Sequence, residues 1–182
     1  MSSADARFAQ VYAAYFKAVH AYCHRRTSVD RVDDATAEVF LVAWRRIDEV
    51  PVGGEALPWL YSVAYGVVSN IWRGISRREK LARKLESIGV ESSPPPDDVV
   101  VMRQEAVEIL KALKKLSRSD QEILRLSIWE ELDSSSVALT LDVSRDAVNQ
   151  RLSRARRRLA NEYDRLKPRR KPSSVTQKGG AW

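Results

Sequence analysis

The sequence predicts an all-α fold made of two small helical domains joined by a linker. Three observations support this fold class: seven glycines and seven prolines are clustered, apolar residues recur at helical spacing, and strand-like alternation is hard to find. The predicted segments are a first domain over residues 1–85, a linker over 86–100, a second domain over 101–166 and a tail over 167–182.

The charge balance restricts the class of partner. The chain has 182 residues and a net charge of +7. An excess of positive charge suggests a polyanionic partner, either nucleic acid or an anionic membrane surface. No apolar run approaches the roughly 20 residues that span a bilayer, and no apolar segment follows the N-terminus as in a secretory signal. The single cysteine, Cys23, fits a reducing compartment.

The first domain should contain three helices. The first starts near Asp5, and its apolar face consists of Phe8, Val11, Tyr12, Tyr15, Val19 and Tyr22. The second follows Asp33 and Asp34, whose charges suit a helix N-terminus. The third has Pro58 in its first turn, where the missing N–H is harmless, and continues into a basic stretch over 73–84.

The segments expected outside the helices differ in composition. Residues 91–98 are polar, proline-rich and acidic, so we expect an extended linker there. Residues 167–182 are basic and then Ser/Gly-rich, which is typical of a disordered tail. Between them, Ser119 to Glu122 matches a capping box, with Ser119 as N-cap of a helix that carries Ile123 and Leu124.

The end of the second domain has the pattern of a helix-turn-helix. A short helix over 134–141 precedes a turn over 142–144, and Ser144 should cap a basic helix that starts at Arg145. Asp142 in the turn tolerates a positive φ better than most residues. Apolar residues of the two helices can pack together: Val137, Ala138 and Leu141 against Val148 and Leu152. The opposite face of the second helix has Arg145, Asn149, Gln150, Ser153, Arg154, Arg156 and Arg157. Asn and Gln can form hydrogen bonds with adenine edges, and Arg can do so with guanine. The alternative to DNA binding is a basic helix that is merely solvated.

Aromatic residues are concentrated between Trp44 and Trp72. We expect Trp44 and Trp59 in the core, and at least one of Tyr61, Tyr65 and Trp72 exposed on a basic helix. Exposed aromatics there could stack on unpaired bases, and the arginines at 73, 77 and 78 could follow a phosphate backbone.

Three segments together resemble the sigma-70 family, in its extracytoplasmic-function group. Residues 33–40 with 42–46 look like the core-binding segment of region 2, and residues 57–64 with 70–74 resemble its promoter-melting and −10 segment. Residues 147–156 resemble the recognition helix of region 4. The resemblance implies a bacterial, cytoplasmic and nucleoid-associated transcription initiation factor without catalytic residues, cofactor or membrane partner.

The resemblance also implies roles for residues. The helix over 33–46 would dock on the clamp helices of the polymerase β′ subunit, with Asp33, Asp34, Ala37, Glu38, Phe40 and Arg45 as the contacts. The loop over 48–57 would capture a flipped base of the −10 element, and the residues near the melted strand would be Val52, Gly53, Gly54, Glu55, Trp59, Tyr61, Tyr65, Asn70 and Arg73. The −35 element would be read by Arg145, Asn149, Gln150, Ser153, Arg154 and Arg157, and the second domain would touch the β flap. An anti-sigma factor is a further partner that the resemblance allows.

The sequence departs from the common family pattern at four positions. Ala37 stands where Gln is common, Tyr65-Gly66 where Arg-Asn is common, and Ser136 where Glu is common. Gly66 within a helix should cost about 1 kcal/mol relative to Ala.

Other functions are open from the residues alone. A plain helix-turn-helix repressor or activator would need no aromatic, basic helix in the first domain. An interaction protein that covers polymerase surfaces would have no use for Asn149 and Arg154. The His20, Cys23 and His24 side chains share one helical turn, but no fourth metal ligand is nearby in sequence, so we expect no metal site.

Overall fold

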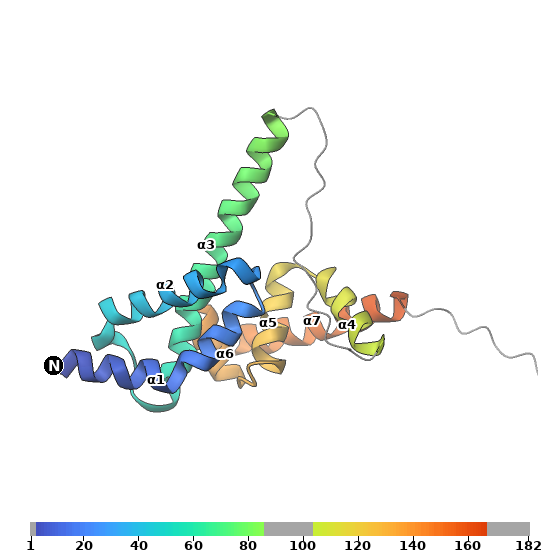
Figure 1. Cartoon of the computed structure of the whole chain (residues 1–182). Coiled ribbons are helices and arrows are strands. Elements are labelled where there is room, and N and C mark those ends of the chain that lie inside the picture. The colour runs from blue at the N-terminus through green and yellow to red at the C-terminus, as the bar shows by residue number, and fades with distance from the viewer. Residues whose placement is uncertain (1–2, 86–103, 167–182) are drawn as a thin grey trace, which may run out of the picture.

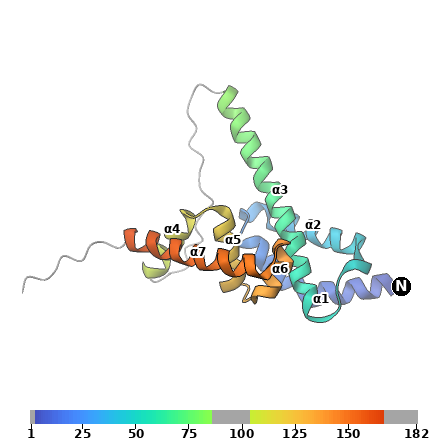
Figure 2. The ribbon, with the colours of Figure 1, turned by 180° about the vertical axis from the view of Figure 1, so that it is seen from behind.

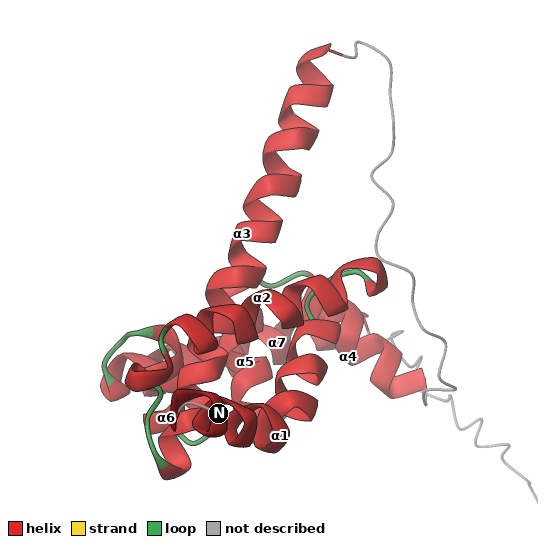
Figure 3. Ribbon diagram, turned by 60° about the vertical axis from the view of Figure 1, so that its left-hand side comes forward, coloured by secondary structure: helices red, strands yellow, loops and turns green. Residues whose placement is uncertain are grey.

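The computed structural model describes residues 3–85 and 104–166, in which helices are joined by short loops and turns and no strand occurs (Figures 1 and 3). This confirms the predicted all-α class. The longer helices are α1 (Ser3–His24), α2 (Val32–Arg45), α3 (Ala56–Leu85), α4 (Gln104–Lys114), α5 (Arg118–Ile128), α6 (Ser134–Leu141) and α7 (Arg145–Leu166). Three short 3₁₀ helices occupy Val29–Arg31, Ile47–Glu49 and Gly53–Glu55. The expected linker and tail lie outside the described residues, and no described helix is long and apolar enough to cross a membrane.

Helices α1, α2 and α3 pack together around an apolar core. Val19 and Tyr22 of α1, Val39 of α2, and Leu60 and Ala64 of α3 are fully or almost fully buried. Spacing of three or four residues within each helix places these side chains on one face, as the sequence predicts. Burial of this apolar surface is the main source of stability for the first half.

Aromatic rings of α1 and α2 form a cluster in the first half. Phe40 of α2 lies 4.8 Å from the ring of Tyr12 and 6.4 Å from that of Phe8. Trp44 meets Phe8 edge-on at 4.9 Å between ring centroids, yet 45% of Trp44 is exposed. The expectation that Trp44 belongs to the core is therefore wrong, because nearly half of this residue remains exposed.

Helix α3 is long, and only its first half belongs to the core. Pro58 lies in its first turn as predicted, and the buried positions continue to Val67 and Val68. Ile71 and Trp72 still pack against this core, and the Trp72 indole N–H donates to the Arg26 carbonyl at 3.1 Å. The C-terminal part of the helix then extends away from the rest of the molecule to Leu85 (Figure 2). The predicted continuation of this helix into the basic stretch is confirmed.

Helices α4 to α7 form the second half, in which α7 contacts α4, α5 and α6. The predicted start of α5 is wrong by two residues: Ser117, not Ser119, is the N-cap, and its hydroxyl accepts a bond from the Asp120 amide at 3.2 Å. Asp120 is therefore the third residue of the helix, the position predicted for Glu122. The Glu122 side chain is therefore free for other contacts.

The two halves pack directly on each other. Helix α6 lies against α3, and the end of α1 meets α5 (Figures 1 and 2). The Thr140 hydroxyl of α6 donates to the Pro58 carbonyl of α3 at 3.3 Å. The described parts of the chain thus share one continuous core.

Candidate nucleic-acid interface

The helix-turn-helix has the boundaries that the sequence predicts. Asp133 caps α6 by accepting the Ser136 amide at 2.7 Å, and this bond lowers the pKa of its carboxyl group. Asp142 ends α6 with a φ of 51°, the left-handed conformation that Asp tolerates. The Ser144 hydroxyl accepts the Ala147 amide at 3.2 Å, which confirms Ser144 as the cap of α7.

Helix α7 is divided into a buried and an exposed face. Val148, Leu152 and Ala155 are buried against the rest of the second half. The six residues expected to read the −35 element are all exposed on the other side: Arg145, Asn149, Gln150, Ser153, Arg154 and Arg157. We call these six residues the α7 face. The hydrogen-bond donors of this face suit base edges in a major groove, and its positive charges suit the adjoining phosphates.

Two hydrogen bonds hold side chains of the α7 face in place. The Ser134 hydroxyl donates to the Asn149 side-chain oxygen at 2.7 Å, so the amide nitrogen remains available as a donor. The Arg154 guanidinium donates to the Gln150 oxygen at 3.1 Å, one helical turn away. Residues that are already ordered lose less conformational entropy when they bind.

The arginines of α7 differ in their intramolecular partners. Arg158 forms an ion pair with Asp120 at 2.6 Å, and Arg165 forms one with Glu162 at 2.5 Å. Arg145 interacts electrostatically with the Asp133 carboxylate. Within the described part of the chain, the arginines at 151, 154, 156 and 157 form no ion pair with an acidic side chain. These cations therefore give the N-terminal two-thirds of α7 a positive surface.

An open pocket of about 560 Å³ lies beside the α7 face. Its lining residues come from the end of α5, the start of α6 and the first half of α7: Ser127, Leu132, Asp133, Ser134, Arg145, Asn149, Leu152, Ser153 and Arg156. Hydroxyl, amide and guanidinium groups predominate over apolar ones. Such a surface fits a polar polymer better than an apolar small molecule.

The loop before α3 is the most exposed part of the first half. Val52 is 89% exposed, and Gly53 has a φ of +82° that suits only glycine well. Exposed side chains continue along α3, and together with the loop they are Val52, Gly53, Gly54, Glu55, Tyr65, Asn70 and Arg73. The expectation of an exposed tyrosine on this basic helix is met by Tyr65.

Two further residues expected at the melted strand are less exposed than these. Trp59 is half-buried, and the Arg46 guanidinium lies 5.4 Å from its ring centroid. Tyr61 is only 3% exposed and stacks on Tyr22 at 5.0 Å. Its hydroxyl donates to Glu130 at 3.3 Å, and burial raises the pKa of Tyr61. Tyr61 therefore does not face solvent in this structure, because Tyr22 of the first half and Glu130 of the second half cover it.

The outer face of α2 is acidic at one end and apolar at the other. Asp33, Asp34, Ala37, Glu38 and Arg45 are exposed, as a surface for polymerase requires. Phe40 is 3% exposed and belongs to the aromatic cluster, so it is not part of this surface. Leu41 and Trp44, which the sequence analysis did not assign to it, are 47% and 45% exposed. The i, i+4 spacing from Ala37 to Leu41 is the signal that would have identified Leu41.

The His20, Cys23 and His24 side chains do not form a site together. His20 lies 3.3 Å from Asp33, and Cys23 is fully buried in the core, where burial raises the pKa of its thiol. In the described part of the chain, no group of three potential ligands converges on a common point.

Comparison with known proteins identifies the second half first. The sigma-70 region 4 family matches residues 106–159, which include the whole helix-turn-helix. Among curated proteins, the chain is 30% identical over 134 residues to a probable RNA polymerase sigma factor, RfaY of Xanthomonas campestris pv. campestris. It is 28% identical over 131 residues to the RNA polymerase sigma factor NccH of Alcaligenes xylosoxydans xylosoxydans. The chain belongs to the sigma-70 family, in its extracytoplasmic-function group.

The match to each relative covers different shares of the two chains. It covers 71% of this sigma factor and 33% of the Xanthomonas protein, and 70% of this sigma factor and 70% of the Alcaligenes protein. This chain thus spans about a third of the length of the Xanthomonas relative.

Solved structures have the same fold. The sigma factor RpoE of Bartonella quintana, in complex with the anti-sigma factor NepR, has a TM-score of 0.63 and 19% identity. That match covers 88% of this chain and 98% of the other. CnrH, in complex with the cytosolic domain of CnrY, has a TM-score of 0.60 and 21% identity over 88% of this chain and 89% of the other.

Proposed function

We propose that this sigma factor binds core RNA polymerase, recognises the −35 and −10 elements of promoters and promotes melting of the DNA. The observation that supports the proposal most is the capped helix-turn-helix with its α7 face. Every side chain of that face is exposed, while the apolar face of the same helix is buried. The protein acts as an initiation subunit in the cytoplasm, at the nucleoid, and has no catalytic activity of its own.

The α7 face reads the −35 element in the major groove. Asn149 and Gln150 present amides for adenine edges, and Arg145 and Arg154 present guanidinium groups for guanine. Arg157 lies farther along the helix, where it contacts phosphate and adds affinity without base preference. The pocket beside Ser134 and Arg156 accommodates the adjoining strand.

The loop over 48–57 and the exposed side of α3 bind the melted −10 strand. Val52, Gly53 and Gly54 leave room for a flipped base, because they carry small or no side chains at an exposed turn. Tyr65 stacks on an unpaired base, and Arg73 holds the backbone. Arg73 is oriented for this by a 2.6 Å hydrogen bond to Asn70.

The outer face of α2 binds the clamp helices of polymerase β′. Its residues are Asp33, Asp34, Ala37, Glu38, Leu41, Trp44 and Arg45. Leu41 and Trp44 supply the apolar centre of this surface, and the charged residues form its rim, as at other protein interfaces. The second half contacts the β flap. An anti-sigma factor is a further partner, in line with the complexes of the two structural relatives.

The decisive experiment is run-off transcription on fragmented genomic DNA with purified core RNA polymerase, with and without this protein. New transcripts that share upstream elements and depend on the added protein are the expected result. A pull-down with core polymerase is done in parallel, with the Leu41→Glu variant as a test of the α2 surface.

Matched arginine variants show whether α7 is used as proposed. Arg154→Ala removes a reader and should abolish the new transcripts, whereas Arg165→Ala removes an arginine that is paired with Glu162 and should leave them unchanged. Absence of transcripts together with absence of core binding would contradict the proposal and favour a plain DNA-binding regulator.

A further inference from the structure

The loop before α3 passes from the interior of the protein to its surface within two residues. Val50 is 1% exposed, whereas Val52 is 89% exposed. Gly53, with its φ of +82°, then turns the chain into the short helix Gly53–Glu55. The tip of the loop, which the proposed function places at the flipped base, therefore lies directly beside a buried residue.

A second, smaller apolar core lies under this loop. Its buried members are Ile47, Val50 and Ala56. Five partly buried residues pack against them, four from α1 and one from α3: Ala4, Phe8, Val11, Tyr15 and Trp59. The spacing of three or four residues along α1 shows that one face of this helix supports the loop from below.

Polar side chains of the same part of α1 reach the backbone of the loop. The Arg7 guanidinium donates to the Val50 carbonyl at 2.5 Å, although the two residues are 43 positions apart in the chain. The Tyr15 hydroxyl donates a longer bond of 3.5 Å to the Gly53 carbonyl. Because these two acceptors flank Val52, α1 holds the backbone on both sides of the exposed tip.

A third polar contact lies where the loop begins. The Arg46 Nε donates to Glu49 at 3.0 Å, and the Arg46 guanidinium lies 5.4 Å from the centroid of the Trp59 ring. The contact raises the pKa of Arg46 and lowers that of Glu49, so both groups stay charged. Both side chains are about half exposed, so solvent screens this ion pair. The bond from the partly buried Arg7 therefore orders the loop more.

From these contacts we infer that Arg7 and Tyr15 are positioning residues for the loop and that they set its base selectivity without touching DNA. This inference rests on the proposed function of the loop. A loop held at two carbonyls presents Val52 and the following turn to a flipped base in one conformation. A base must then fit that shape, whereas a loosely held loop would adapt to several bases.

Arg7 should matter more than Tyr15. A hydrogen bond from a charged donor contributes more than one between neutral groups, and the acceptor here belongs to a buried residue. The bond from Tyr15 is long, and its donor is neutral. The two residues should therefore have the same kind of effect but different magnitudes.

Hydrogen–deuterium exchange of the full-length protein tests whether Arg7 orders the loop. Arg7→Met removes the donor and keeps a side chain of similar length, so exchange in a peptide over residues 48–57 should become about tenfold faster. Arg7→Lys keeps a charged donor and should restore most of the protection. Lys17→Met is the matched control, because it removes a cation from an exposed position of the same helix and should change nothing.

Selection from a randomised promoter pool tests the selectivity. The pool is built on a promoter found by run-off transcription, with the −10 and −35 positions randomised, and the DNA bound by reconstituted holoenzyme is sequenced. Arg7→Met should lower the enrichment of the preferred base at the flipped position several-fold. Enrichment at −35, which the α7 face reads, should stay the same. A direct phosphate contact by Arg7 would instead lower the total DNA bound without changing the base enrichment.

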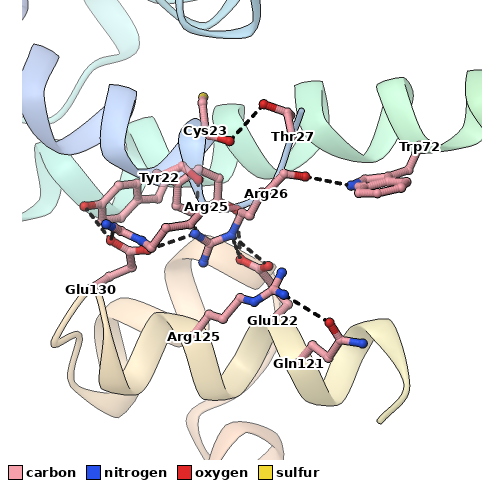
Figure 4. A network of polar contacts seen from close by, with 11 residues as sticks. Tyr22, Cys23, Arg25, Arg26, Thr27, Trp72, Gln121, Glu122, Arg125 and Glu130 are labelled. Atoms are coloured by element: carbon pink, nitrogen blue, oxygen red, sulfur yellow. Dashed lines mark hydrogen bonds and ion pairs between the residues drawn. The ribbon is translucent and has the colours of Figure 1, made fainter. Parts of the chain in front are cut away.

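Tyrosine variants of α1 separate positioning from general stability. Tyr15→Phe removes the hydroxyl at the loop and should lower the same enrichment, though by less than Arg7→Met. Tyr22→Phe is the matched control. The Tyr22 hydroxyl donates to Glu122 at 2.8 Å, within a buried network around Arg26 that connects α1 to α5 (Figure 4). Its loss should lower stability and leave the enrichment at −10 unchanged.

Three results would overturn the inference. They are unchanged exchange of the loop in Arg7→Met, faster exchange without a change in base enrichment, and an equal loss of enrichment in Tyr22→Phe. A reference holoenzyme that enriches no sequence at all would be a different failure. It would overturn the proposed function, and with it the selectivity, whatever the exchange of the loop shows.

Discussion

The hydroxyl of Ser134 at the start of α6 donates a 2.7 Å hydrogen bond to the side-chain oxygen of Asn149 on α7. The bond joins the two helices of the helix-turn-helix and leaves the Asn149 amide nitrogen free on the α7 face. An asparagine held in this way can present its donor to a base edge at low entropic cost.

Replacement of Asn149 by Ala should relax −35 preference. We expect a loss of about 1–3 kcal/mol at one base pair, because a base-edge contact disappears. Ser134→Ala should produce a smaller loss at the same base pair, and the two effects should not be additive. Anisotropy titrations with matched and scrambled −35 duplexes measure both. Equal effects of Asn149→Ala on the two duplexes would remove this residue from the readers.

Replacement of Arg157 by Ala should weaken DNA binding evenly across sequences. Arg157 is exposed and has no acidic partner among the described residues, so it is available to a phosphate. Loss of one phosphate contact should reduce the slope of log affinity against log salt by about one. Arg165→Ala is the control, since Arg165 is paired with Glu162 near the end of α7. An unchanged slope for Arg157→Ala would contradict its assignment.

Replacement of Leu41 by Glu should weaken binding of core polymerase without unfolding the protein. Leu41 is 47% exposed on the outer face of α2, so a charge there is solvated in the free protein. Phe40→Ala should instead destabilise the fold by about 3–5 kcal/mol, because its ring is buried among other aromatics. Pull-down and urea denaturation distinguish the two effects. Normal core binding by Leu41→Glu would exclude Leu41 from the interface.

Replacement of Ser117 by Ala should destabilise the second half. The hydroxyl of Ser117 caps α5 by accepting the Asp120 amide, and loss of such a cap costs about 1 kcal/mol. Ser119→Ala lies inside the first turn and should change the free energy of unfolding by less. Urea denaturation followed by circular dichroism measures the difference. A larger effect at Ser119 would support the cap that the sequence pattern suggested.

Replacement of Gly66 by Ala should stabilise the protein by about 0.5–1 kcal/mol, because alanine is the better helix former. No atom lies within 4 Å of the position that the new Cβ would occupy. Gly53→Ala has equal space but a φ of +82°, so the same change should destabilise the protein. Thermal melting of the two variants compares them directly. Destabilisation by Gly66→Ala would indicate that this glycine has another role.

Local patterns in the sequence were sufficient for the helices and for the α7 face. Apolar spacing and capping residues predicted α6 at its observed bounds, the left-handed Asp142 and the Ser144 cap. These features depend on residues within one or two helical turns, where backbone hydrogen bonds and steric limits act directly. The buried and exposed faces of α7 follow from the same periodicity.

Where two apolar residues are neighbours in a helix, their spacing alone did not show which of them is buried. Phe40 and Leu41 are neighbours on α2, and only packing against the rings of α1 decides that Phe40 is inside and Leu41 outside. The capping pattern of Ser119 was similarly ambiguous, because Ser117 offers the same hydroxyl two residues earlier.

By itself, the sequence determined an all-α chain whose helix-turn-helix presents a basic, amide-bearing face, because these properties arise from interactions between near neighbours. Only the tertiary structure decided that Tyr61 is covered, that Glu122 pairs with Arg26, and that α6 lies over the loop before α3. These contacts join residues far apart in the chain. They depend on packing, hydrogen bonding and the balance of desolvation and ion pairing between the two halves, which local sequence patterns do not encode.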